Sequence, residues 1–418
     1  MNEYIVGVDI GSSKICAAAG KYDKYGKLQI RGITSVSYSG MKNGVIVDMD
    51  NTANAIKNCI KQLEGMVDTQ VLGFYISLPS RIGTLVSNRG VVAVASDDRE
   101  ISQKDVKRVI NAAKIVKVPT DKEIIGVIPK QYIIDGYDKI KDPVGMSASR
   151  LEVDSYVILA ESTVISNLFK TVEKAGYEVL GMVFQPMADA EVVLKKEEMD
   201  LGCALVNIGA DSIDISIYKD EKLSYTSCIN IGGNSITNDI AICLKLPFSE
   251  AEKLKIKYGI IGIDNLELKD SIKVNLGYNN VIKINSSMLL DVIEARAEEL
   301  LKLIMKNLKE SGQYSQISGI VIAGGGLATI KGIEELGEYV FKKPVRVGTP
   351  DYVGAINPAY VSAVGTVRDV LNTMKANKSN NNVEDEAAVA CEETSKKTSS
   401  KQKGPIIKIK EFLTEFFE

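Results

Sequence analysis

Residues 6–14 read VGVDIGSSK, and residues 205–214 read LVNIGADSID. In both stretches an apolar, strand-forming run meets Asp or Asn, then Gly, then small hydroxyl-bearing residues. A tight turn between two strands exposes consecutive backbone N–H groups, and Gly allows the close approach that a phosphate oxygen needs. The repetition predicts two similar hairpins that grip a polyphosphate from both sides.

The first stretch also offers side chains suited to a phosphorylated ligand. Ser12, Ser13 and Lys14 add hydroxyl donors and a positive charge to the turn. Asp9, just before the turn, suits a carboxylate that holds a hydrated Mg²⁺ ion through water. A single Asp-x-Gly-Ser is an ordinary turn in most proteins, so this prediction depends on the repetition.

A third glycine cluster supports the same chemistry. The segment GIVIAGGGLATIKGI at 319–333 predicts an apolar strand that runs into Gly324, Gly325 and Gly326 and then into the start of a helix. The N-terminus of a helix favours anions, because its first N–H groups lack partners within the helix. We therefore expect this junction to lie beside the two hairpins.

Length and composition exclude several classes of function. A chain of 418 residues predicts two or more domains, and the net charge of −3 gives no overall footprint for nucleic acid. The absence of histidine excludes Ser-His-Asp triads, histidine acid–base catalysis and histidine metal sites. The six cysteines form no C-x-x-C pair, which indicates reduced thiols in a cytoplasmic protein rather than a zinc or redox motif. The first residues do not resemble a signal peptide, and no apolar run is long enough to span a membrane.

The last residues predict a peripheral membrane contact. At 100° per residue, one face of the segment 405–418 is apolar, formed by Ile406, Ile409, Phe412, Leu413, Phe416 and Phe417. Residues 396–410 carry lysines and no acidic residue, so the segment could lie on an anionic membrane and fold as it binds. The alternative is an amphipathic cap that packs back onto the core. The long polar stretch before it, predicted to be a disordered linker, argues against that alternative.

The combination of motifs resembles known families. Paired hairpins with a strand–Gly-Gly-Gly–helix element are similar to the ATPase superfamily of actin, sugar kinases and heat-shock chaperones. The segments VIPKQYIID at 127–135 and DPVGMSASRLEV at 142–153 resemble the FtsA family of cell-division proteins, whose first domain carries an inserted subdomain at this place. FQPMADAEVVL at 184–194 and VRVGTP at 345–350 fit the same family, and the resemblance covers the chain apart from the linker.

The resemblance implies an α/β fold of the actin type, with two duplicated domains and an α+β insert in the first. The expected boundaries are 1–83 and 156–200 for domain 1, 84–155 for the insert, 201–372 for domain 2, 373–404 for the disordered linker and 405–418 for the amphipathic helix. The last helix of domain 2 is expected to return to domain 1.

The resemblance also implies roles for individual residues around bound ATP and Mg²⁺. The first phosphate loop is Asp9, Gly11, Ser12, Ser13 and Lys14, with Asp9 near the metal, and the second is Asn207, Gly209, Ala210, Asp211 and Ser212. Glu252 and Lys255 are expected near ribose and adenine. The pocket is completed by Gly232, Gly233, Asn234, Gly324, Gly325 and Gly326. Gln185 matches the residue that positions attacking water.

The second loop departs from the family pattern, which commonly reads Asp-Ile-Gly-Gly-Gly-Thr. Asn207 lacks the carboxylate that accepts from a metal-bound or attacking water, and Asp211 adds repulsion near the phosphates unless Mg²⁺ intervenes. We therefore expect nucleotide binding with, at most, very slow hydrolysis.

The resemblance implies a bacterial cell-division protein that polymerises and tethers the FtsZ ring to the inner face of the cytoplasmic membrane at the septum. Its expected partners are FtsZ, further copies of itself, the anionic membrane surface and later divisome proteins, but no nucleic acid. One alternative is a cytosolic small-molecule kinase with the same ATP cleft, for which the sequence shows no catalytic marker. A second is an MreB-like filament protein, whose family has a different subdomain in place of residues 84–155.

Overall fold

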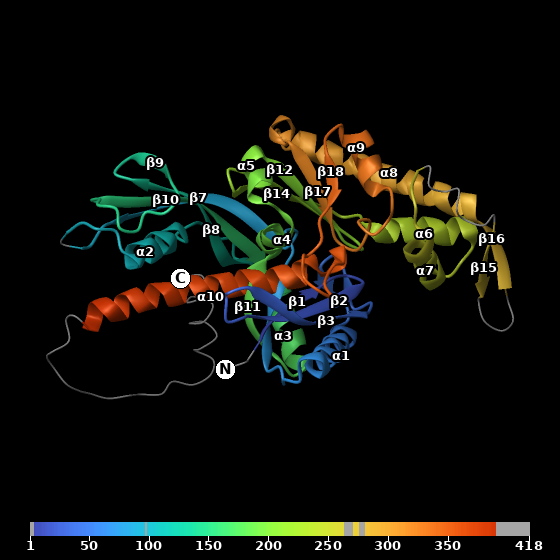
Figure 1. Cartoon of the computed structure of the whole chain (residues 1–418), viewed down its shortest axis with the longest axis horizontal. Helices are drawn as coiled ribbons and strands as arrows, with labels where there is room; N and C mark the ends of the chain where they lie inside the picture. Colours follow the sequence, from blue (N-terminus) through green and yellow to red (C-terminus); the bar gives the residue numbers. More distant parts are fainter. Residues whose placement is uncertain (1–3, 97, 263–270, 276–280, 390–418) are drawn as a thin grey trace.

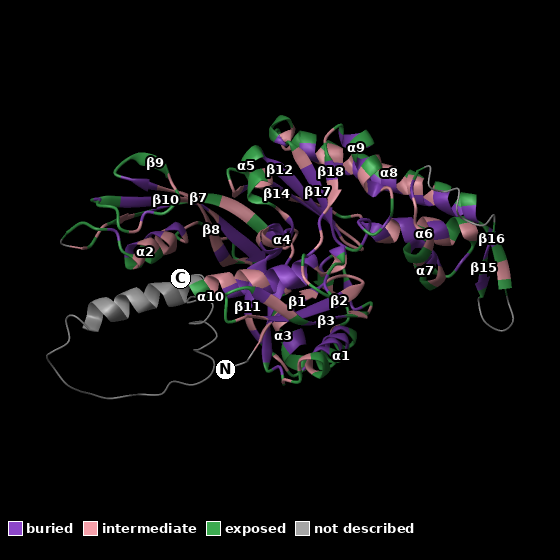
Figure 2. Ribbon diagram, in the orientation of Figure 1, coloured by how far each residue is buried: buried purple, intermediate pink, exposed green. Residues whose placement is uncertain are grey.

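The computed structural model describes residues 4–96, 98–262, 271–275 and 281–389, with side chains as far as Lys375 (Figure 1). It shows two α/β domains, each built on a five-stranded sheet, and a smaller α+β insert attached to the first. Buried residues gather in the two central sheets and on the helix faces that cover them (Figure 2). Among the described helices, none combines the length and the apolar character needed to cross a bilayer.

The first sheet has the strand order β11-β6-β1-β2-β3. Strands β1 and β2 form an antiparallel hairpin, β3 continues it, and β6 and β11 add in parallel on the other side. The strands are β1 (Ile5–Ile10), β2 (Lys14–Tyr22), β3 (Leu28–Ser37), β6 (Gly73–Leu78) and β11 (Glu178–Phe184), and short strands β4 (Met41–Lys42) and β5 (Val45–Ile46) pair beside it. Helices α1 (Met49–Val67) and α3 (Ser162–Lys174) contribute to its core, where Ile56, Ile60 and Leu63 of α1 are fully buried.

The second sheet repeats this arrangement with the order β14-β13-β12-β17-β18. Its first three strands are antiparallel and its last two add in parallel, as in the first sheet. The strands are β12 (Cys203–Ile208), β13 (Ile213–Lys219), β14 (Lys222–Ile229), β17 (Gly319–Ala323) and β18 (Val345–Val347). The duplicated α/β fold expected from the repeated sequence is therefore confirmed.

Helices surround the second sheet and extend beyond it. They are α6 (Gly233–Leu244), α7 (Phe248–Tyr258), α8 (Ser286–Glu310) and α9 (Ile333–Phe341), with the strand pair β15 (Ser271–Asn275) and β16 (Val281–Asn285) at the outer end of α6 to α8 (Figure 1). Helix α8 packs its buried stripe, which includes Ile293, Leu300 and Ile304, into the largest apolar core of the protein.

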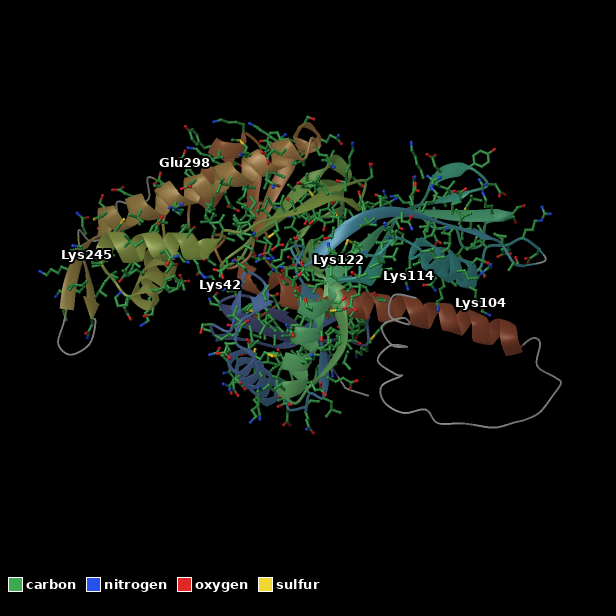
Figure 3. All side chains as sticks on the ribbon, turned by 180° about the vertical axis from the view of Figure 1, so that it is seen from behind. Lys42, Lys104, Lys114, Lys122, Lys245 and Glu298 are labelled. Carbon is green, nitrogen blue, oxygen red and sulfur yellow. The ribbon has the colours of Figure 1, made fainter. Side chains whose placement is uncertain are left out.

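The insert is an antiparallel sheet of order β7-β10-β8-β9 with one helix packed on it. Its elements are β7 (Gly83–Ala93), α2 (Gln103–Ala113), β8 (Lys122–Ile134), β9 (Tyr137–Ile140) and β10 (Arg150–Glu161). A Cβ atom at Gly90 would lie 2.2 Å from the backbone oxygen of Val109, so this glycine lets α2 approach the sheet closely. Figure 3 shows Lys104 of α2 and Lys114, which follows α2, on the opposite side of the molecule from Lys245, which follows α6.

Helix α10 (Val361–Val389) packs on strands β1 and β2 of the first sheet. A Cβ at Gly7 of β1 would lie 2.6 Å from the backbone oxygen of Ala363, so glycine is needed for this contact. The short helices α4 (Gln185–Val193), α5 (Lys196–Leu201), η2 (Tyr314–Gln316) and η3 (Pro358–Tyr360) complete the connections.

The C-terminal part of α10 differs from the expected organisation. We expected a linker from residue 373, whereas the helix continues to Val389. No Gly or Pro interrupts residues 366–389, so this part of the chain contains no strong helix breaker. The rest of the predicted linker and the segment 405–418 lie outside the described residues, together with all six predicted membrane residues.

Candidate functional site

A cleft of about 980 Å³, open to solvent, lies between the two domains. Of the site residues predicted from the sequence within the domains, all except Gly232 line it. They come from the β1–β2 turn, the β12–β13 turn, the start of α4, the first turn of α6, α7 and the turn after β17. Segments some two hundred residues apart in the chain are thus brought to one place.

The β1–β2 and β12–β13 hairpins have the same turn. The backbone N–H of Gly11 donates to the oxygen of Lys14 over 3.0 Å, and that of Gly209 donates to the oxygen of Ser212 over 2.8 Å. Both hairpins also share a register, in which Asp9 pairs with Cys16 and Asn207 with Asp214. The residue that precedes each turn therefore faces an equivalent position on the next strand.

Gly232 packs closely against the turn of the second hairpin. A Cβ at Gly232 would lie 2.6 Å from the oxygen of Gly209, so only glycine permits this contact. The next two N–H groups of α6, those of Gly233 and Asn234, donate to the oxygens of Gly209 and Ala210. These first N–H groups of α6 therefore hold the loop in place instead of pointing at a ligand.

The third glycine cluster packs against the same hairpin. Gly324 has φ of +88°, and the N–H of Gly326 donates to the oxygen of Ile208 over 2.8 Å. The expected helix start directly after the glycines is wrong, because residues 324–330 form turns and α9 begins only at Ile333. The cluster therefore contributes its tight backbone to the cleft, and the N-terminus of α9 lies further along the chain.

Lys255 is buried and bonded within the protein. Its Nζ atom lies 2.7 Å from the carboxylate of Glu252 and donates to the oxygen of Gly233 over 3.1 Å and to Thr237 over 2.9 Å. Burial lowers the pKa of the Lys255 ammonium, although the charge of Glu252 opposes this effect. Lys255 thus ties α7 to the start of α6, while the half-buried Glu252 remains at the cleft wall.

Two acidic side chains meet at the cleft from opposite domains. Burial raises the pKa of Asp9 to about 7, and the nearby charge of Asp214 adds to the effect. Burial likewise raises the pKa of Asp214. Such a pair suits a divalent cation held through water, because the cation would compensate both charges. Among the described residues, no cluster of three or more metal-ligating side chains is present, so an ion here would depend on water and ligand oxygens.

Gln185 and Asn207 share a buried hydrogen-bond cluster. The Nε2 atom of Gln185 donates to Ser362 over 2.9 Å, and the Nδ2 atom of Asn207 donates to Asp189 over 2.6 Å and to Ser362 over 3.2 Å. Burial raises the pKa of Asp189 to about 8. The amide groups of both predicted catalytic residues are thus directed at a buried acid of domain 1.

Among the residues of this region that the sequence prediction missed are Asp189, Asp214, Ser362 and Arg81. Asp214 occupies on β13 the position that Cys16 has on β2, so comparing the two hairpins position by position could have found it. Asp189 lies one helical turn after Gln185 on α4, which is also a readable spacing. Ser362 and Arg81 carry no local signal, since α10 and the β6–β7 connection bring them here only in the folded chain.

Comparisons with known proteins agree with this architecture. The family model described as "Cell division protein FtsA" matches residues 204–365, and "SHS2 domain inserted in FTSA" matches residues 84–159. Among solved structures, the chain is similar to the PilM–PilN type IV pilus biogenesis complex, with a TM-score of 0.62 and 16% identity over 88% of this chain and 98% of that one. It is also similar to MreB5 of Spiroplasma citri bound to ADP, with a TM-score of 0.54 and 14% identity over 90% and 98% of the two chains. The fold is therefore the actin-like two-domain α/β fold with an SHS2 insertion.

Sequence relatives are closer. The chain is 35% identical to the cell division protein FtsA of Bacillus subtilis over 88% of this chain and 83% of that protein. It is 34% identical to the FtsA of Borreliella burgdorferi, over 90% of this chain and 92% of the relative. With this identity along nearly the whole length, the chain belongs to the FtsA family of bacterial cell-division proteins.

Proposed function

We propose that this protein binds ATP with Mg²⁺ in the cleft between its two domains. The observation that carries the proposal is the matched pair of hairpin turns, closed at Gly11 and Gly209, that line the cleft from opposite domains. Asp9 and Asp214 supply the carboxylates for a hydrated cation. The likeness in fold to an ADP-bound MreB5 supports the proposal.

Hydrolysis in this cleft is slow or absent. Asn207 replaces the family's usual carboxylate, and its amide is directed at Asp189 rather than at an attacking water. Gln185 likewise donates to Ser362. Neither amide can act as a general base, and for either one to orient an attacking water these buried hydrogen bonds would have to rearrange first.

In the cell, the protein acts as a polymerising adaptor that tethers FtsZ to the inner face of the cytoplasmic membrane during division. Family membership supports the division role, and the amphipathic sequence of 405–418 with its basic approach supports peripheral attachment. A single short helix binds membranes weakly, so polymerisation would strengthen attachment by presenting many anchors at once.

The test combines nucleotide titration with membrane co-sedimentation. Full-length protein should bind ATP in the presence of Mg²⁺, release phosphate very slowly, and transfer none to a panel of sugars. It should pellet with vesicles that contain anionic lipid and carry FtsZ into the pellet, whereas a chain ending at Gly404 should do neither. Neutral vesicles serve as the control. Sugar phosphorylation, or equal pelleting of the two chains, would contradict the adaptor function and favour a cytosolic enzyme.

A further inference from the structure

Arg81 lies where the chain leaves the first domain for the insert, between the end of β6 at Leu78 and the start of β7 at Gly83. Its side chain lines the cleft between the domains. It also lines a second hollow, of about 1120 Å³, between the insert strands and β14. The guanidinium therefore stands between the candidate nucleotide site and the space that separates the insert from domain 2.

Arg81 and its neighbour connect the two domains. The Nη2 atom of Arg81 donates to Oδ1 of Asn230, just after β14, over 2.9 Å. The hydroxyl of Ser80 donates to the carboxylate of Asp214 on β13. Both acceptors belong to domain 2 and both donors to domain 1, so these two bonds span the cleft.

The other terminal nitrogen of Arg81 is unsatisfied. Nη1 is buried and has no hydrogen-bond partner within the described part of the chain. Leaving a buried charged donor unpaired is costly, and an anion that enters the cleft would remove this cost. The backbone leaves space for the side chain, because a Cβ at Gly44 would lie 2.7 Å from Cδ of Arg81.

The position of Arg81 in the cleft indicates which part of a nucleotide it would meet. The charge of Arg81 lowers the pKa of Asp214, and the charge of Asp214 raises that of Asp9. Arg81 therefore lies in the part of the cleft that contains these two carboxylates. Lys255, another cation of the cleft wall, is already paired with Glu252. A phosphate close to the Asp9 and Asp214 cation site would thus lie near the guanidinium of Arg81, which lines the same cleft.

We propose that Arg81 recognises the terminal phosphate of a nucleoside triphosphate and thereby distinguishes it from a diphosphate. With a triphosphate bound, Nη1 donates to that phosphate while Nη2 keeps its bond to Asn230. The planar guanidinium holds its two terminal nitrogens apart in a fixed fork, so it can donate to the phosphate and to Asn230 at once. A lysine ammonium has a single nitrogen and cannot reproduce that geometry. Triphosphate binding then tightens the contact between the domains, beside the first strand of the insert. This inference depends on the nucleotide binding proposed above.

The experiment compares wild-type protein with Arg81→Gln and Arg81→Lys by calorimetric titration with Mg²⁺. The ligands are a non-hydrolysable ATP analogue, ADP, and ADP with inorganic phosphate. Arg81→Gln should weaken triphosphate binding about tenfold or more, as expected for loss of a charge-assisted hydrogen bond, and change ADP binding by less than about threefold. Arg81→Lys should recover part of the triphosphate affinity, which a merely structural defect would not do.

Arg89→Gln is the matched control. Arg89 lies on β7, pairs with Asp154 and Glu152 of the insert, and does not line the cleft, so its replacement should leave both affinities unchanged. Equal loss of ATP-analogue and ADP binding in Arg81→Gln, or no loss at all, would overturn the proposal. So would Arg81-dependent binding of inorganic phosphate that matches the triphosphate effect, because the ligand would then be free phosphate. A wild-type protein that binds neither nucleotide would instead refute the proposed function.

Discussion

The Nδ2 atom of Asn207 donates a hydrogen bond of 2.6 Å to the carboxylate of Asp189, from the second domain to the first. Asp189 is almost fully buried, with 1% of its surface exposed, and its other carboxylate oxygen has no hydrogen-bond partner within the described residues. An aspartate at 207 would place a second acid against this one. The amide at 207 therefore has a structural role in this chain, because it donates to a buried acid that a carboxylate would repel. This role is separate from the missing catalytic carboxylate inferred from the sequence.

Replacing Asn207 with Asp should destabilise the protein in mildly alkaline solution and much less in acid. The pKa of Asp189 is about 8, so two buried carboxylates in contact would both be ionised only near and above that pH. Their repulsion should then lower the free energy of unfolding by about 2–3 kcal/mol. Urea denaturation at about pH 5 and about pH 8 would measure the difference. Asn230→Asp, at an exposed position facing Arg81, is the control and should change stability by less than about 0.5 kcal/mol. Equal stability of Asn207→Asp and wild type at both pH values would contradict the proposed contact.

Stability of the ligand-free protein should fall as the pH rises from weakly acidic to mildly alkaline. Burial raises the pKa of Asp9 to about 7 and that of Asp189 to about 8, against 3.8 as the ordinary value. Between 3.8 and these values the folded chain holds protons that the unfolded chain has released, so each group lowers the unfolding free energy by roughly 1.4 kcal/mol per pH unit. Above about pH 8 this contribution levels off. Asp9→Asn should remove the part that ends near pH 7, and an unchanged slope would argue against the raised pKa.

Binding of Mg²⁺ with nucleotide should release protons near neutral pH. The cation favours ionised Asp9, so a carboxyl whose pKa is about 7 loses its proton when the ion arrives. Calorimetry of the same titration in two buffers of different ionisation enthalpy measures the number of protons released. Asp9→Asn should abolish that release, whereas proton uptake or no exchange in the wild type would place the cation elsewhere.

Gly324→Ala should be far more damaging than Gly354→Ala. Both glycines have positive φ, +88° and +81°, so both substitutions carry a backbone cost of about 1 kcal/mol. A Cβ at 324 would also lie 2.3 Å from Oδ1 of Asn207, whereas a Cβ at 354 meets nothing within 4 Å. We expect thermal unfolding to separate the two variants by several degrees and nucleotide binding to be lost only in Gly324→Ala. Similar melting temperatures of the two variants would show that Asn207 and its neighbours can move to accommodate the added methyl group.

Lys255→Met tests the contact between α7 and α6. The buried ammonium pairs with Glu252 and donates to Gly233, so its loss should lower the unfolding free energy by about 1–3 kcal/mol and weaken nucleotide binding. The neighbouring Lys253, which is exposed and pairs with Glu250, offers a matched control, and Lys253→Met should cost less than about 1 kcal/mol. Equal costs for the two variants in urea denaturation would mean that the buried contacts of Lys255 add nothing.

The sequence by itself determined the duplicated domains, the two hairpin turns and most of the cleft, because these depend on local patterns. An apolar run followed by Asp or Asn and then Gly specifies a strand and its turn wherever the strand later packs. The motifs of the insert likewise resemble those of the family independently of any tertiary contact. Only the tertiary structure decided that the helix after 361 continues past 373, that α9 begins at Ile333, and that Ser362 and Arg81 belong to the cleft. The physical reason is that burial, pKa and hydrogen-bond partners of a side chain depend on which distant elements approach it, and no pattern of neighbours along the chain records that approach.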